Sequence, residues 1–176
     1  MASSTSAPSD DRAIVINTSP LLALIAALDD LTSLSAAYSR VIVPYAVANE
    51  VLAAGRCGFG VDAFVAAKHL LRGSELLVIE PWLTNSLDLG EAAVIATALE
   101  LKINRVCIDE TVGRRVARLA GLNVTGSLGV LVKLKSVGAI HAIAPCIERM
   151  RAQGIWMSEA VCSAALALAG EQPDGR

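Results

Sequence analysis

Short apolar runs rich in β-branched residues alternate with helical patterns along this chain, and that alternation constrains its fold more than any other feature. The predicted buried strands cover residues 13–17, 40–43, 75–79, 105–108 and, more briefly, 122–124. Strands this apolar fit a parallel sheet whose two faces are both covered by helices. The sequence therefore predicts an α/β fold around a doubly wound parallel sheet.

Helical segments follow the predicted strands. At the first of them, Ser19 is a suitable N-cap before Pro20, and further on Asp88 with Glu91 three residues later forms a capping box. No sixth strand is expected after residue 124. The predicted helices cover approximately 20–28, 44–54, 61–72, 88–102, 111–120, 127–137, 144–153 and 158–169.

Length and composition predict one folded domain. The chain has 176 residues, of which 54% are hydrophobic and 18% charged, enough apolar material for a sizeable core. We expect a flexible tail at 1–12, a single domain at 13–169 and a polar tail at 170–176. The longest apolar stretches are shorter than the roughly 18 residues that indicate a membrane helix, so no membrane association is expected.

Charge and residue usage narrow the class of protein. The net charge of −2 and the pI near 5.7 lack the basicity of dedicated nucleic-acid binders, although a local basic patch remains compatible with them. Only two each of Trp, Tyr and Phe are present, which disfavours RNA modules built on several stacking side chains. The first residues are polar and acidic and contain no secretion signal, so we expect a cytoplasmic protein whose four cysteines are reduced core thiols.

Polar and acidic side chains follow the predicted strands at the edge where ligands of open parallel sheets bind. Asn17 ends the first strand, Asp109 and Glu110 end the fourth, and Glu50 and Glu91 lie on helices after the second and third. Carboxylate and amide oxygens, without cysteines or a glycine-rich loop, suit a hard cation such as Mg²⁺ or Mn²⁺. Such an ion supports phosphodiester hydrolysis.

Each of these residues also has a purely structural explanation. Glu91 and Asp109 are well placed to serve helix starts, Glu50 to be a solvated surface residue, and Asn17 to close an Asx turn. Arg114, Arg115 and Arg118 lie close together on a predicted helix. They could bind phosphates or simply form its solvated face. Nucleotide-binding loops, hydrolase triads and zinc-protease motifs are absent from the sequence.

Five short motifs occur in an order that resembles the PIN-domain family. They are Ile14-Val-Ile-Asn-Thr-Ser-Pro-Leu, Val43-Pro-Tyr-Ala-Val-Ala-Asn-Glu-Val, Leu87-Asp-Leu-Gly-Glu-Ala, Cys107-Ile-Asp-Glu-Thr and Val124-Thr-Gly-Ser. The order is similar to that of a prokaryotic, nucleic-acid-binding branch related to VapC-type toxins. The resemblance covers about residues 13–169 and implies a PIN-like three-layer α/β/α sandwich with four to five parallel strands.

The resemblance also implies a set of functional residues. PIN domains are ribonucleases that bind Mg²⁺ or Mn²⁺ through an acidic cluster, which corresponds here to Asp109, Glu91, Glu50 and Asn17. Around that cluster, the resemblance implies supporting roles for Thr18, Glu110 and Thr125. The chain departs from the family at Asn17, where the usual residue is Asp, and this removes one negative charge from the metal site.

The leading hypothesis is a metal-dependent endoribonuclease, a hydrolase acting as the toxin of a toxin–antitoxin pair. Its partners would be an RNA substrate and a small antitoxin, and the apolar helices at 20–28 and 164–169 could support a homodimer. The alternative is a catalytically weak or inactive PIN-like module that binds nucleic acid or protein. A third hypothesis is an acid-cluster phosphohydrolase acting on a small substrate.

Overall fold

The computed structural model describes residues 11–28, 30–55 and 58–172 and contains one parallel sheet of five strands. The strands are β1 (Ala13–Ile16), β2 (Arg40–Val43), β3 (Leu71–Arg72), β4 (Arg105–Cys107) and β5 (Asn123–Thr125), in the spatial order β3-β2-β1-β4-β5. Val15 of the central strand pairs with Ile42 on one side and Val106 on the other. The chain order reverses at β1, so β1 and β4 meet at the switch point of the sheet.

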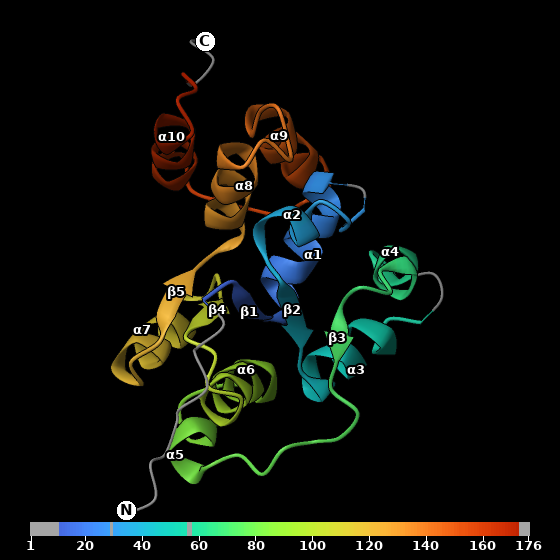
Figure 1. The fold of residues 1–176 in the computed structure, drawn as a ribbon, viewed down its shortest axis with the longest axis vertical. Helices are drawn as coiled ribbons and strands as arrows, with labels where there is room; N and C mark the ends of the chain where they lie inside the picture. Colours follow the sequence, from blue (N-terminus) through green and yellow to red (C-terminus); the bar gives the residue numbers. More distant parts are fainter. Residues whose placement is uncertain (1–10, 29, 56–57, 173–176) are drawn as a thin grey trace, which may run out of the picture.

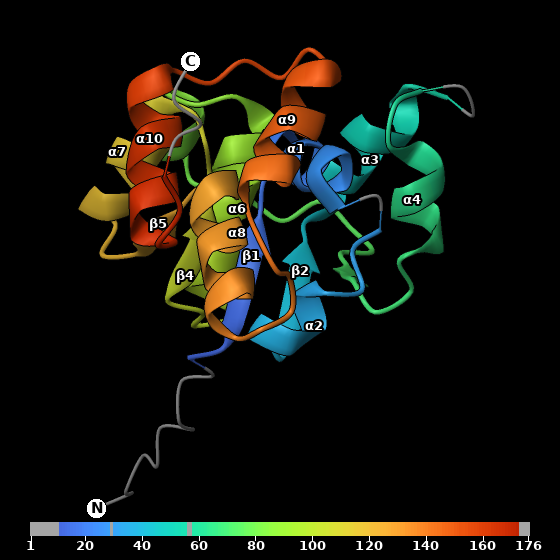
Figure 2. The same ribbon diagram turned by 90° about the horizontal axis from the view of Figure 1, so that it is seen from above.

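Helices cover both faces of the sheet, as Figures 1 and 2 show, and the three-layer α/β/α sandwich predicted above is confirmed. One layer holds α1 (Thr18–Leu28), α2 (Leu34–Ala37), α8 (Ser127–Ser136), α9 (Ala144–Ala152) and α10 (Glu159–Leu168). The other holds α3 (Tyr45–Ala53), α5 (Pro81–Thr84), α6 (Leu89–Glu100) and α7 (Thr111–Leu119), with α4 (Val61–Ala66) against α3. No helix in the described part of the chain has both the length and the apolar character needed to cross a bilayer.

The core lies between these layers and explains the apolar strands. All four residues of β1 are buried, as expected for a parallel strand covered on both faces. Cys107, Cys146 and Cys162 are buried within this core, whereas Cys57 lies outside the described residues. The predicted tails also lie largely outside them, but Glu171 is tied to the fold: its carboxylate accepts bonds from Lys135 (2.7 Å) and from the amide of Ile143 (2.8 Å).

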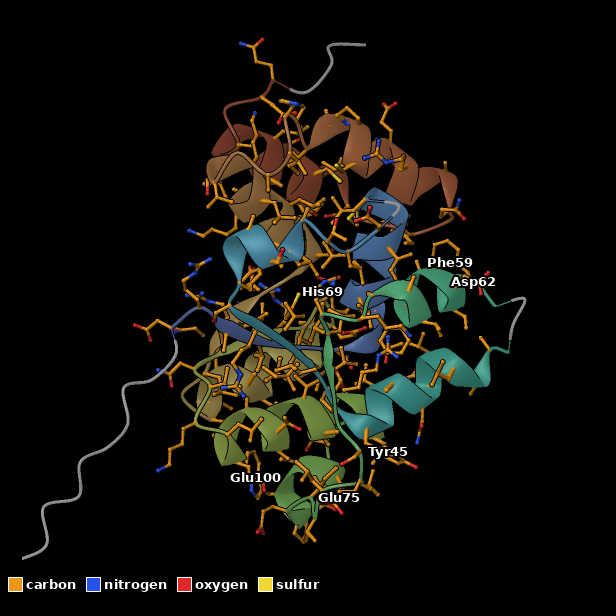
Figure 3. The ribbon with its side chains drawn as sticks, turned by 45° about the vertical axis from the view of Figure 1, so that its right-hand side comes forward. Tyr45, Phe59, Asp62, His69, Glu75 and Glu100 are labelled. Carbon is orange, nitrogen blue, oxygen red and sulfur yellow. The ribbon has the colours of Figure 1, made fainter. Side chains whose placement is uncertain are left out.

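The expected strand at 75–79 is wrong, and so is the expected helix from 61 to 72. The helix α4 ends at Ala66, and the third strand is the two-residue β3, which pairs with Ile42 and Val43 of β2. Beyond Gly73 the chain leaves the sheet, and Val78 is 97% exposed. Figure 3 shows Glu75 close to Glu100 of α6, at the end of the molecule away from His69.

Arg72 provides the physical reason for this shift. Its guanidinium donates to the carbonyl of Phe64 and stacks 4.3 Å from the Phe64 ring, which fastens the end of β3 to α4. The backbone amide of Gly73 extends the pairing by donating to the Val43 carbonyl at 2.9 Å. Tertiary contacts of Arg72 therefore override the β propensity of the following apolar run.

The starts of α6 and α1 can be compared with the N-caps predicted from the sequence. Asp88 caps α6 as expected, because its Oδ1 accepts a hydrogen bond from the Glu91 amide at 2.7 Å. The first helix begins at Thr18, before the expected Ser19 cap, and its first bond runs from the Leu21 amide to the Asn17 carbonyl. Asn17 is thereby fixed at the junction of β1 and α1.

Candidate functional site

Asn17 lies at the centre of the carboxyl edge of the sheet. It follows β1, its amide N–H donates to the Cys107 carbonyl of β4 at 3.0 Å, and only 3% of the residue is exposed. The side-chain Nδ2 donates to Glu110 Oε2 at 3.5 Å, a long contact. The other end of the amide, Oδ1, is buried and accepts no hydrogen bond from the described residues.

Three side-chain oxygens converge over Gly90, in the first turn of α6. Asn17 Oδ1 lies 3.1 Å from the position that a Cβ on Gly90 would take, and Asp88 Oδ1 and Glu50 Oε2 each lie 3.3 Å from it. We call Asn17, Glu50 and Asp88 the Gly90 cluster. The Thr18 hydroxyl donates to Glu50 Oε2 at 2.6 Å and so orients that carboxylate. Glycine is needed at position 90 because any larger side chain would enter the space between these oxygens.

Glu91 is buried beside this cluster, with 5% of the residue exposed. Burial raises the pKa of the Glu91 carboxyl, and the nearby charges of Asp88 and Glu110 raise it further. Its Oε1 has no hydrogen-bond partner within the described chain, and the close approach of Gly113 in α7 leaves no room for a Cβ there. An ionised, incompletely paired carboxylate in such a place is costly unless a cation or proton compensates it.

Asp109 follows β4 and is held by the backbone. Its Oδ1 accepts a hydrogen bond from the Ser127 amide at 2.8 Å, and Gly126 approaches it too closely to carry a Cβ. Arg114 donates to the neighbouring carbonyl of Ile108 at 2.8 Å and so supports the same turn. Desolvation by the surrounding protein raises the pKa of the Asp109 carboxyl, while the hydrogen bonds from Ser127 oppose that rise.

Two pockets open at this edge, one on each side of Asn17. A pocket of about 630 Å³ contains Glu50, Asp88 and Gly90 among its walls. A pocket of about 700 Å³ lies between α7, the β5–α8 turn and the α9–α10 connection, and Asp109, Glu110 and Thr125 line it. The site is therefore a pair of adjacent recesses that share the carboxyl edge of β1 and β4.

The structure brings most of the predicted residues to one edge and separates others. Asn17, Thr18 and Glu50 are in direct contact or share the Gly90 cluster, and Glu91 is close enough to Glu110 to feel its charge. Asp109 occupies the second recess with Thr125. The predicted arginines do not form one surface, because Arg114 turns toward Ile108 whereas the exposed Arg115 and Arg118 are not among the residues lining that recess.

Asp88 is the member of the site that sequence analysis missed. It was expected only to cap α6, and it does so, but the same Oδ1 also faces the Gly90 cluster. A signal existed in the sequence, because a carboxylate three residues before Glu91 must lie at the same end of α6.

The donor set has the chemistry of a hard-cation site. In the described ranges, no three His, Cys, Asp or Glu side chains are grouped so that they could hold a metal ion. The Gly90 cluster instead combines two carboxylates with the unpaired Asn17 oxygen, and the unpaired Glu91 oxygen lies nearby. Oxygens of this type are preferred ligands of Mg²⁺ and Mn²⁺, so the residues present fit such an ion.

Acidic side chains thus gather at the switch point of this parallel α/β/α sandwich. A family model described as a PIN domain matches residues 13–171, which is most of the chain. The chain belongs to the PIN-domain family. A search of curated proteins finds no significant match.

Proposed function

We propose that this protein is a divalent-cation-dependent endoribonuclease. The observation that supports it best is the buried, unpaired Asn17 Oδ1, which shares the space over Gly90 with the carboxylates of Glu50 and Asp88, together with the unpaired Glu91 Oε1 against Gly113. Buried polar atoms are normally satisfied, and an orphaned oxygen therefore indicates a missing partner. Oxygens in this environment call for a cation rather than for an anion.

In this proposal Asn17, Glu50 and Asp88 would hold Mg²⁺ or Mn²⁺ over Gly90, with Glu91 next to them, and Asp109 would contribute its charge from the second recess. When bound, the ion supplies an activated water and neutralises charge on the phosphate. Thr18 keeps the Glu50 carboxylate oriented through its 2.6 Å hydrogen bond. Glu110 orients the Asn17 amide by accepting its N–H.

Glu91 and the arginines complete the proposed chemistry. Burial raises the pKa of Glu91 in the ion-free protein, and a bound cation would favour the ionised carboxylate. Of the three predicted arginines, Arg114 lines the Asp109 recess and would contact an RNA phosphate there, whereas Arg115 and Arg118 could only contact phosphates outside it. Thr125 would support Asp109 from the neighbouring strand, where its carbonyl accepts from the Ile108 amide at 3.0 Å.

A toxin role in the cytoplasm, restrained by a small antitoxin protein, is the biology that we propose for this nuclease. The proposed homodimer needs an exposed apolar surface, and α1 is unsuitable because most of its apolar side chains are buried, several of them facing α8 and α9. The second helix considered for it, α10, exposes Val161 and Leu168. A self-association surface on this protein would therefore involve α10.

The test is cleavage of a mixed pool of structured and unstructured RNA with Mn²⁺, with Mg²⁺ and with EDTA. We expect cleavage with either ion, none with EDTA, and a loss of roughly 100-fold or more for Asp109→Asn, the scale seen when one charge-stabilising group is removed. Asp62→Asn is the matched control, because Asp62 is exposed on α4 (Figure 3) and lines neither pocket of the site. A folded wild type that is silent with every ion would contradict the proposal.

A non-catalytic binding module is the second candidate, favoured by Asn17 itself. The amide directs an N–H toward Glu110, where the usual family residue would carry a second negative charge. A binding module should retain its RNA affinity in EDTA and in Asp109→Asn. Cleavage of a generic phosphate ester but not of RNA would instead indicate the small-substrate phosphohydrolase.

A further inference from the structure

Trp156 is a large apolar side chain that lies in solvent although the residues on either side of it pack against the core. It lies in the connection between α9 and α10, and 85% of the residue is exposed. Its neighbours Ile155 and Met157 pack against the core, and the Ile155 amide donates to the Met150 carbonyl at 3.0 Å. The backbone of this segment is therefore anchored on both sides of a tryptophan whose own ring is left in solvent.

The ring belongs to the wall of the 700 Å³ pocket that contains Asp109. Figure 2 shows the α9–α10 connection crossing the end of the molecule where β1 and β4 terminate. Arg114, Ser127 and Ser158 line the same pocket. An aromatic surface, a cation and the proposed catalytic carboxylate thus share one recess, whose volume is within the range of small-ligand sites, about 300–1,000 Å³.

This combination matches the chemistry of a nucleotide. A nucleobase offers a flat apolar face that stacks on an exposed indole, and its attached phosphate is attracted by a guanidinium. A duplex keeps its bases stacked inside, so only a single strand or an unpaired base can use such a platform. The fixed backbone around Trp156 reduces the entropy that binding would otherwise cost.

We propose that Trp156 is a stacking platform for an unpaired base of the nucleic-acid strand that occupies the Asp109 pocket. The proposal rests on the function proposed above and deepens it, since it names the residue on which an unpaired base would stack. It also assigns to the α9–α10 connection a part in positioning the strand. The other exposed tryptophan, Trp82, lies on α5 in a different pocket and has no such role.

The two tryptophans allow a direct binding test in EDTA, where no cleavage is expected. Trp82→Phe leaves Trp156 as the single fluorescent indole, and Trp156→Phe leaves Trp82. Each variant is titrated with a single-stranded oligoribonucleotide and with an abasic oligomer of equal length and charge. We expect quenching only for Trp82→Phe with the base-bearing strand, because the abasic strand offers phosphates but nothing to stack.

Affinity gives the second measurement. Trp156→Ala should weaken binding of the base-bearing strand by roughly 5- to 150-fold, the range for loss of one stacked base, whereas Trp82→Ala should leave it unchanged. A duplex of the same sequence should bind both variants equally. Equal quenching by the abasic strand, or undiminished affinity in Trp156→Ala, would overturn the platform.

The outcomes also separate this proposal from the function on which it rests. If the wild type cleaves RNA with Mn²⁺ but Trp156→Ala cleaves and binds single strands as well as Trp82→Ala, the platform fails and the nuclease stands. If base-specific quenching occurs without cleavage under any ion, the platform stands and the nuclease fails. If a protein partner binds through Trp156 and no oligoribonucleotide quenches its fluorescence, Trp156 is not a stacking platform for a base.

Discussion

The two recesses of the candidate site are built in different ways. Asp109 is positioned by main chain, because Ser127 donates to it and Arg114 supports the preceding carbonyl. The Gly90 cluster is positioned by side chains, since Thr18 orients Glu50 and an Asn17 oxygen remains without a partner. One recess is already satisfied in the free protein, and the other is not.

This difference indicates where a cation would change the molecule most. Binding to a group that already has its hydrogen bonds brings little additional stabilisation, whereas pairing a buried orphan removes a desolvation penalty of about 1–3 kcal/mol. We therefore expect ion binding to stabilise the Gly90 cluster, while Asp109 keeps the position that its hydrogen bonds already give it. Single substitutions that affect one recess at a time can test this division.

Gly90→Ala should have the largest effect on the cluster. The new methyl group would lie 3.1–3.3 Å from all three oxygens, so cation-dependent cleavage should fall by roughly 100-fold, as when a charge-stabilising group is lost. Without an ion, the better helix propensity of alanine, worth about 1 kcal/mol, is opposed by these close contacts, so the stability should change much less than the cleavage. Cleavage assays and thermal unfolding with and without Mg²⁺ measure both effects.

The control is Asn85→Ala, an exposed change at the C-terminal end of α5 that lies in neither pocket of the site. If Gly90→Ala cleaves RNA as fast as this control, the three oxygens do not act together. The distinction between the recesses would then be wrong.

Much of this arrangement could be predicted from sequence because parallel strands end at a common edge. The apolar run of β1 and the polar residues after β1 and β4 needed no tertiary information to be placed together. The Asp88 cap was equally accessible, since N-capping depends on three consecutive peptide units. Local rules and strand polarity therefore determine the site's location.

The missing parts depend on contacts between distant residues. β3 is formed by two residues because Arg72 fastens to Phe64, and no periodicity in 75–79 reports that contact. The double role of Asp88 and the need for glycine at position 90 follow from the distance between α3 and α6. Such distances are set by packing in three dimensions, which a single sequence does not display.

Asn17→Asp should sharpen the contrast by adding charge to the side-chain-built recess. Without a divalent ion the new carboxylate faces Glu110 Oε2 across about 3.5 Å, so the unfolding temperature should fall. With Mg²⁺ we expect roughly tenfold tighter ion binding, equivalent to about 1.4 kcal/mol. Calorimetric titration of Mg²⁺ into both proteins measures this, and unchanged affinity would show that position 17 does not touch the ion.

Glu91→Gln tests the buried carboxylate through pH. A carboxyl whose pKa is raised by folding contributes stability that is fully present below its unfolded pKa, about 4, and is lost as pH rises through the folded pKa. At pH 7 in EDTA the variant should therefore be more stable than the wild type. The difference should vanish as the pH falls toward 4.

Denaturant unfolding at several pH values measures the Glu91 effect, with the exposed Glu148→Gln as a control. Addition of Mg²⁺ should reverse the order at pH 7, because the ion stabilises only the protein that retains the carboxylate. A pH-independent difference between wild type and Glu91→Gln would show that the orphaned oxygen is not a titrating charge.

Thr18→Val should have the smallest effect, since it removes only the group that orients Glu50. The loss of one hydrogen bond to a carboxylate costs about 1.5–3 kcal/mol when fully expressed, but Glu50 is exposed and water can replace the hydroxyl, so we expect cleavage to fall only about 2- to 5-fold. Thr97→Val, at another buried threonine, is the control. In a Glu50→Gln background, Thr18→Val should then have no further effect, because two residues that act through one contact are not additive. An additive loss would mean that Thr18 contributes to the recess independently of Glu50, and the side-chain-built half of the site would extend to the start of α1.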